Sequence, residues 1–97
     1  MEIRIEDLQL EQREVNKKKV SRYKEKYEAG IEMEPISVSY CVHTGRYMIN
    51  DGHHRTVASY LAGKTSIASR TEPCYIYNCS GVGSEWALYS IRHTIFR

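Results

Sequence analysis

The sequence predicts an α+β fold, a small mixed sheet with about three helices, in a single domain over residues 1–97. Two patterns indicate this class: short runs alternate apolar and polar residues, as half-buried strands do, and between them apolar residues recur at helical spacing. A length of 97 residues suits one domain. With 41% hydrophobic and 27% charged residues, the composition is that of a folded globular chain.

The expected elements follow from local patterns along the chain. Asn16 is a suitable helix cap, and Gly30 suits the end of that helix. Asp51-Gly52 is a strong turn signal ahead of a second helix. In order, we expect a strand over 2–6, a loop over 7–14, a helix over 17–27, strands over 36–40 and 47–49 joined by a turn at 43–46, a helix over 53–62, strands over 67–70 and 74–77, a turn at 80–83 and a closing helix over 84–96.

The closing helix over 84–96 is predicted to be apolar on most sides. Trp86, Tyr89 and His93 recur on one face, and further apolar residues lie together on another. Such a helix either packs into the domain or forms a contact between two copies of the chain. The sequence leaves both arrangements open, so a homodimer through residues 84–96 is one expectation.

The most informative stretch is the predicted turn between the strand at 47–49 and the helix at 53–62. His53, His54 and Arg55 would lie at a helix N-terminus, where unpaired backbone N–H groups and the helix dipole already favour an anion. The two imidazoles and the guanidinium add further donors, and Asp51 places one carboxylate beside them. This chemistry suits a phosphate.

Residues 45–58, Gly-Arg-Tyr-Met-Ile-Asn-Asp-Gly-His-His-Arg-Thr-Val-Ala, resemble the signature segment of the ParB/sulfiredoxin-like superfamily. The resemblance covers roughly residues 1–78, although only residues 45–58 are specific. It implies a fold in which a strand delivers a phosphate-binding turn onto a helix. The Asp-Gly-His-His-Arg form is similar to ParB-like nuclease domains and close to the turn of the free serine kinases on the same fold.

The resemblance also implies roles for individual residues. The last two turn residues, His54 and Arg55, would contact phosphate oxygens together with Gly52 and His53, and Asp51 would bind Mg²⁺ or act as a general base. Glu34 corresponds to an acidic residue that acts on the acceptor hydroxyl in the kinase-like members. The predicted catalytic residues are therefore Asp51, Glu34 and His54. The plainer alternatives are that Asp51 only forms the turn and that Glu34 is a solvated loop carboxylate.

Charge is unevenly distributed along the chain, and this bears on the partner. Residues 1–34 carry 8 basic and 9 acidic side chains, whereas residues 35–97 carry 6 basic and 3 acidic ones. The helix over 17–27 nevertheless has a basic face. That face is either simply solvated or contacts a nucleic-acid backbone, in which case the contacting residues would be Lys17, Lys18, Lys19 and Arg22.

The sequence supports three candidate functions. The first is a phosphate-binding domain of the ParB-like nuclease type, acting on nucleic acid or a nucleotide with metal-assisted phosphoester hydrolysis. The second is a non-catalytic DNA-binding module, and the third is a small NTPase or serine-kinase-like domain with ATP or CTP as ligand. His53 stands where sulfiredoxins carry their catalytic Cys, which excludes that activity. With no apolar run long enough to span a membrane and no signal segment, a cytoplasmic protein is expected.

Overall fold

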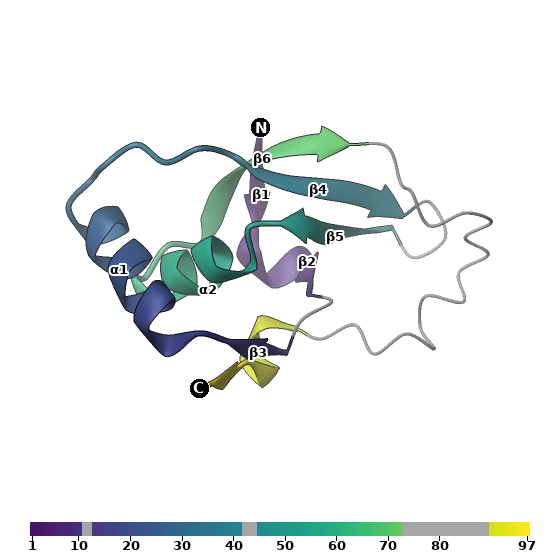
Figure 1. Ribbon diagram of the computed structural model, residues 1–97. Helices are drawn as coiled ribbons and strands as arrows, with labels where there is room; N and C mark the ends of the chain where they lie inside the picture. Colours follow the sequence, from purple (N-terminus) through teal and green to yellow (C-terminus); the bar gives the residue numbers. More distant parts are fainter. Residues whose placement is uncertain (11–12, 42–44, 73–89) are drawn as a thin grey trace.

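A computed structural model describes residues 1–10, 13–41, 45–72 and 90–97 and confirms the α+β class (Figure 1). Its elements are β1 (Glu2–Arg4), the 3₁₀ helix η1 (Ile5–Asp7), β2 (Leu8–Gln9), β3 (Glu14–Val15), α1 (Lys17–Glu28), β4 (Ile36–Cys41), β5 (Arg46–Asp51), α2 (His53–Leu61), β6 (Ser66–Glu72), the 3₁₀ helix η3 (Ile91–His93) and β7 (Ile95–Phe96).

Five strands form a mixed sheet in the order β1-β6-β4-β5-β2 (Figure 1). The hairpin partners β4 and β5 are antiparallel, whereas β4 runs parallel to β6 and β5 runs parallel to β2. A register shift between Ser37 and Val38 interrupts the β4–β5 ladder close to Asp51, the last residue of β5. The irregularity lies next to the turn that leads into α2, a position where bulges commonly redirect a strand.

Both helices pack against each other and cover one face of this sheet (Figure 1). Alternation along the central strands directs Ile36, Val38 and Ile49 to that face, where all three are fully buried. Val20 from α1 and Val57 from α2 complete the same core. Burial of these side chains fixes α1 and α2 to the sheet, and with them the turn that precedes α2.

The end of the described chain pairs with the segment just before α1. β3 and β7 form a separate two-stranded parallel sheet, in which Glu14 is opposite Ile95 and Val15 is opposite Phe96. The backbone N–H of Lys17 also donates to the carbonyl oxygen of Arg97 at 2.9 Å. The first turn of α1 is therefore held by residues more than three quarters of the chain away.

Several local predictions are confirmed. The helix at 17–27 exists as α1, and the Asn16 side chain accepts a hydrogen bond from the backbone N–H of Lys19 at 3.0 Å, as an N-cap should. The strands at 36–40, 47–49 and 67–70 correspond to β4, β5 and β6, and the helix at 53–62 corresponds to α2.

Other predictions are wrong. The described residues contain two α-helices rather than three, because residues 91–96 of the predicted closing helix form η3 and β7 instead. Residues 91–96 therefore present no α-helical face to the dimer contact expected over 84–96, which stays a prediction because residues 84–89 lie outside the described residues. The loop expected at 7–14 contains β2 and the first residue of β3, two strands of two residues each, which are too short to show an alternating pattern. The strand over 2–6 ends at Arg4. The predicted strand at 74–77, the turn at 80–83 and residues 84–89 lie outside the described residues.

Candidate functional site

The turn between β5 and α2 depends on Gly52. Its φ of 114° lies in a region that L side chains rarely adopt. A Cβ at this position would overlap the Ile36 side chain, approaching its Cγ2 and coming within 2.8 Å of its Cβ. Glycine therefore lets β5 turn sharply into α2 while the turn stays pressed against a core residue of β4.

The N-terminus of α2 opens without a side-chain cap. Gly52 occupies the N-cap position, where it has no side chain to offer, and its carbonyl oxygen accepts from both the N–H and the hydroxyl of Thr56 at 2.8 Å. The amide groups of a first helical turn have no carbonyl partner within their own helix. A helix start whose N-cap residue has no side chain can bind an external anion at the positive end of its dipole.

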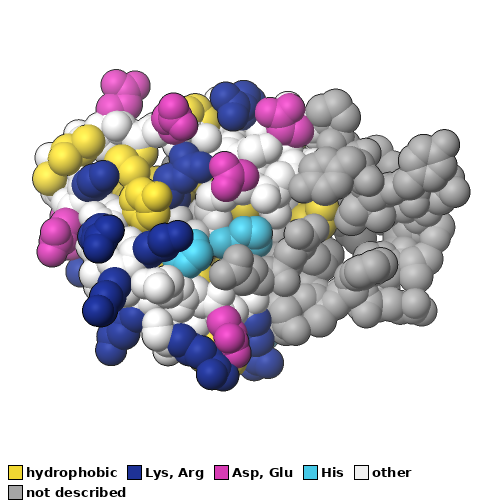
Figure 2. All heavy atoms as spheres, in the orientation of Figure 1, with side chains coloured by type: hydrophobic (Ala, Val, Ile, Leu, Met, Phe, Trp, Pro, Cys, Tyr) yellow, Lys and Arg dark blue, Asp and Glu magenta, His cyan; other side chains and the backbone are white. Residues whose placement is uncertain are grey.

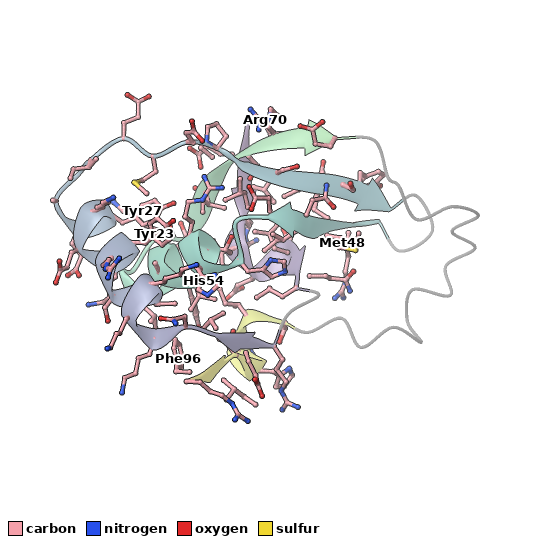
Figure 3. The ribbon with its side chains drawn as sticks, viewed as in Figure 1. Tyr23, Tyr27, Met48, His54, Arg70 and Phe96 are labelled. Carbon is pink, nitrogen blue, oxygen red and sulfur yellow. The ribbon has the colours of Figure 1, made fainter. Side chains whose placement is uncertain are left out.

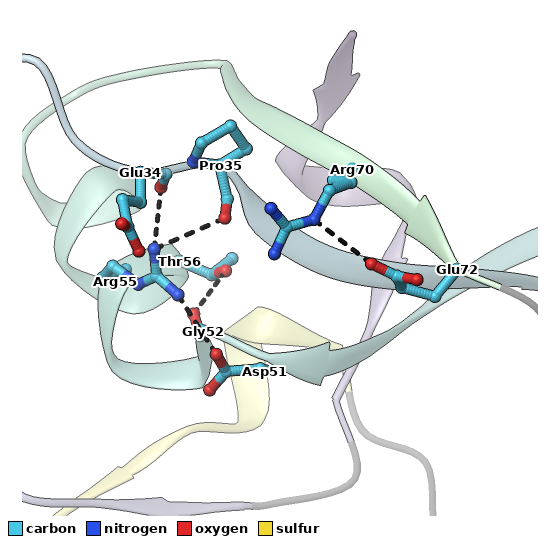
Figure 4. Close-up of polar contacts among 8 residues, drawn as sticks. All are labelled: Glu34, Pro35, Asp51, Gly52, Arg55, Thr56, Arg70 and Glu72. Carbon is cyan, nitrogen blue, oxygen red and sulfur yellow. Dashed lines mark hydrogen bonds and ion pairs between the residues drawn. The ribbon is translucent and has the colours of Figure 1, made fainter.

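Arg55 is anchored beside this turn rather than extended into solvent (Figure 4). Its Nη1 donates to the carbonyl oxygen of Glu34 at 2.7 Å and lies 3.5 Å from that of Pro35, while Nη2 lies 3.5 Å from Oδ2 of Asp51. The Arg55 side chain is only 14% exposed, whereas that of Asp51 is 84% exposed. These contacts occupy some of the five N–H donors of the guanidinium and fix the direction of the others.

His54 lies between the two helices and has a defined partner (Figure 3). Its Nε2 accepts a hydrogen bond from the backbone N–H of Asn16 at 3.0 Å. Nε2 therefore carries no proton, and the neutral ring has its hydrogen on Nδ1. Burial lowers the pKa of His54, and the positive charge of Lys19 lowers it further.

His53 is half-buried beside His54. Burial is the main factor that lowers its pKa, the neighbouring His54 lowers it further, and only the Asp51 carboxylate acts in the opposite direction. Both imidazoles are consequently expected to be neutral near pH 7. At that pH the permanent positive charge at the turn comes from Arg55 and Lys19.

A cavity of about 900 Å³, which we call the turn pocket, brings most of the predicted site residues together. It is lined by Lys19, Tyr23, Glu32, Met33, Glu34, Asn50, Asp51, Gly52, His53, His54 and Arg55. The sequence predicted every turn residue in this set and also Glu34, but it assigned Lys19 to a separate surface. Lys19 and Tyr23 are four residues apart on α1, and the packing of α1 on α2 carries them to the pocket.

Asn50 also lines the turn pocket, although no sequence pattern indicated a role for it. Its Nδ2 donates to the Ser39 hydroxyl across the β4–β5 hairpin at 2.7 Å. Its Oδ1 is buried and has no hydrogen-bond partner among the described residues. A buried amide oxygen of this kind is a destabilising feature unless a water molecule or a ligand donor reaches it.

The carboxylates of the pocket fit a metal ion only in company with a phosphate. Among the described residues, no group of three or more His, Cys, Asp or Glu is arranged to hold a metal. Asp51 and Glu34 both line the turn pocket. Mg²⁺ keeps several waters and commonly takes one or two protein carboxylates plus substrate phosphates. Asp51, with or without Glu34, meets that requirement once a phosphate is bound.

The basic face predicted for the first helix exists and borders the turn pocket. Lys17, Lys18, Lys19 and Arg22 are exposed on α1 and make no ion pair with the described residues, whereas Lys24 is paired with Glu28 at 3.0 Å. In Figure 2, Lys and Arg side chains gather over α1 on the face that also presents the histidines. Of the four, only Lys19 lines the pocket.

Comparison with known proteins assigns no family to the chain. No protein-family model matches it, and no curated protein matches it significantly. In the parts of the chain that the structure describes, no helix is both long and apolar enough to cross a membrane. Function is therefore inferred from the residues and geometry of the turn pocket.

Proposed function

We propose that this chain is a phosphate-binding domain of the ParB-like nuclease type, which binds a nucleotide or a nucleic-acid phosphate at Gly52–Arg55. The observation that carries the proposal is the uncapped N-terminus of α2, which opens on the turn pocket beside the cationic side chains of Lys19 and Arg55. The strand–turn–helix order of β5, Gly52 and α2 supports the ParB/sulfiredoxin-like assignment.

The size and charge of the pocket favour a ligand larger than inorganic phosphate. A volume of about 900 Å³ falls in the range of pockets that enclose whole small molecules. The carboxylates of Glu32, Glu34 and Asp51 share the pocket with the cations. A bare anion would be repelled by them, whereas a phosphate accompanied by Mg²⁺ would be accommodated.

Phosphoester hydrolysis is the reaction that these groups support best. Asp51 would hold Mg²⁺ or orient the attacking water, and Glu34 would be the second carboxylate near the reacting group. Arg55 and the first-turn amides of α2 would stabilise charge on the phosphoryl oxygens. A bound Mg²⁺ would supply a Lewis acid on those oxygens.

The test is Mg²⁺-dependent cleavage of plasmid and single-stranded DNA by the wild type and by Asp51→Ala and Arg55→Lys variants. Asp7→Ala is a matched control, because Asp7 is an exposed aspartate that does not line the pocket. We expect the pocket variants to lose activity and Asp7→Ala to keep it. Equal activity in all four proteins would refute the catalytic roles.

A second candidate, a non-catalytic DNA-binding module, is favoured by the exposed basic face of α1. In this case the phosphate backbone would contact Lys17, Lys18, Lys19 and Arg22, and affinity would fall steeply with salt. Three of these residues, Lys17, Lys18 and Arg22, do not line the turn pocket. Replacing all three by Gln should flatten the salt dependence, whereas replacing Lys64, Arg70 and Arg46 should not.

The third candidate function is a small NTPase or serine-kinase-like domain. Calorimetric titration with ATP, CTP and free serine distinguishes it from the nuclease and from the DNA-binding module. Saturable binding of a nucleotide together with serine would favour a phosphotransferase. Binding of DNA alone would favour the first two candidates, which the cleavage assay then distinguishes.

A further inference from the structure

We propose that His54 is a positioning residue that holds Lys19 in the turn pocket, and that Lys19 rather than His54 meets the bound phosphate. The inference rests on the proposed phosphate-binding function and deepens it. It reverses the role that the resemblance implies for His54, which would otherwise be a direct phosphate ligand.

Two hydrogen bonds connect His54 to Lys19 through one residue. Asn16 uses its backbone N–H to donate to Nε2 of His54 at 3.0 Å, and its side-chain Oδ1 to accept from the N–H of Lys19 at 3.0 Å. Asn16 is therefore held by α2 while it caps α1. The link fixes the first turn of α1 over the N-terminus of α2, and the Lys19 side chain from that turn lines the pocket.

The same geometry disfavours His54 as a cationic phosphate ligand. A protonated imidazole would present N–H at Nε2 to the N–H of Asn16, so the hydrogen bond would be replaced by an unfavourable donor–donor contact. Only the neutral ring fits. A neutral His54 therefore holds the start of α1 through Asn16. A protonated His54 would lose this hydrogen bond and release α1.

Charged and titratable groups from several elements share the turn pocket with His54. On α1 the neighbours are Lys19 and Tyr23, and on α2 they are His53 and Arg55; Asp51 ends β5, and Glu32 and Glu34 come from the segment before β4. Burial, and then the positive charge of Lys19, lower the pKa of His54.

The two roles predict opposite responses to acid. If His54 bound phosphate directly, protonation would add a positive charge and strengthen binding. If His54 positions Lys19, protonation breaks the link to Asn16 and weakens binding. The sign of the pH dependence therefore distinguishes a positioning residue from a ligand.

The probe is a fluorescent oligo(dT), because neither its phosphodiesters nor its bases titrate in the acidic range used. Binding is measured at about pH 7.5 and at a lower pH at which nitrogen chemical shifts show the His54 ring to be protonated, because its pKa lies below the usual histidine value. His54→Gln retains an acceptor for the Asn16 N–H but does not titrate, whereas His54→Ala removes the acceptor. Lys19→Gln removes the charge, and the double variant His54→Ala/Lys19→Gln completes a mutant cycle.

We expect the wild type to bind more weakly at the lower pH. His54→Gln, in which His53 is the pocket histidine that still titrates, should not show this weakening. At the higher pH, Lys19→Gln and His54→Ala should each lose about five- to tenfold in affinity, the range of one charge-assisted contact. The double variant should lose no more than Lys19→Gln alone, because His54 acts only through Lys19. Additive losses, or tighter binding by the wild type in acid, would overturn the proposal.

An independent readout tests the positioning link without any ligand. Nitrogen chemical shifts of the His54 ring should report a neutral imidazole protonated at Nδ1, and the Asn16 amide should be protected from exchange in His54→Gln but not in His54→Ala. A ring protonated at Nε2 near neutral pH would refute the link even if the probe binds. Failure of the wild type to bind either oligo(dT) or ATP would instead refute the proposed function, and with it the role of Lys19.

Discussion

Gly52→Ala tests whether the turn is as tightly constrained as its geometry indicates. Placing an L residue at a φ of 114° should cost about 1–2 kcal/mol. The added methyl would lie 2.8 Å from Cβ of Ile36, a fully buried residue of β4, and overpacking of this kind costs a further ~1–3 kcal/mol. Together these terms amount to roughly 2–5 kcal/mol, a large share of the 5–15 kcal/mol that stabilises a typical domain.

Gly63→Ala is the matched control for that experiment. Gly63 also has a positive φ, of 84°, but nothing lies within 4 Å of the position its Cβ would take. The Gly63→Ala variant should therefore lose only the stability that the positive φ costs, without a contribution from steric overlap. We expect urea denaturation to give Gly52→Ala the lower free energy of unfolding, and thermal melts to place its midpoint about 10 °C or more below the wild type. Equal destabilisation of both variants would refute the overlap with Ile36.

Three further predictions concern the contacts around the turn pocket. Arg55→Lys should destabilise the fold by about 1–3 kcal/mol in urea denaturation, because an ammonium cannot reproduce the guanidinium contacts to Glu34 and Asp51. Ser39→Ala should cost about 1–3 kcal/mol by the same measure, since it leaves Nδ2 of Asn50 without its acceptor. Stability should also fall in acid: the pKa of His54 is lowered in the folded state, so the unfolded chain takes up the proton first, and stabilisation present above about pH 6.5 is lost as the pH falls through the folded-state pKa.

Each of these predictions has a distinguishing control. The double variant Ser39→Ala/Asn50→Leu removes both polar partners and should recover part of the loss; no recovery would contradict the buried-amide explanation. His54→Gln should reduce the difference in stability between neutral and acidic buffer, and an unchanged difference would assign it to other groups. An Arg55→Lys protein with wild-type stability would show that the Glu34 carbonyl contact contributes little.

The parts of the fold that the sequence predicted are those with local signals. The cap at Asn16, the alternation in β4 and the glycine before α2 each act over a few residues, so their structural effects can be read directly from the sequence. The sequence analysis did not predict β2, although Leu8 and Leu10 in this region are fully buried. A strand of two residues is too short to show the alternation of apolar and polar residues. The closing helix was predicted from spacing over 84–96, but Ile95 and Phe96 pair with β3, a distant partner that local spacing cannot reveal.

The sequence predicted which residues make up the candidate site, but not their hydrogen-bond partners. The turn residues and Glu34 were expected at one site, and they do line one pocket. The orientation of each side chain depends on tertiary partners: His54 is directed to the Asn16 amide, and Arg55 to backbone carbonyls before β4. Lys19 reaches the pocket only because α1 packs against α2. Side-chain identities are local information, whereas hydrogen-bond partners are set by the packed fold.

The β3–β7 pairing has a consequence for the order in which the domain assembles. The side chain of Arg13 donates to the backbone of His93, 80 residues along the chain, and the first amide of α1 is satisfied by Arg97. Contacts between residues so far apart in the sequence form late, because closing a large loop costs conformational entropy. During synthesis, α1 and α2 can meet while β7 is still within the ribosome, but the first amide of α1 gains its partner only when β7 and Arg97 have emerged. The contacts that β7 makes with the segment before α1 would then be among the last to form during folding.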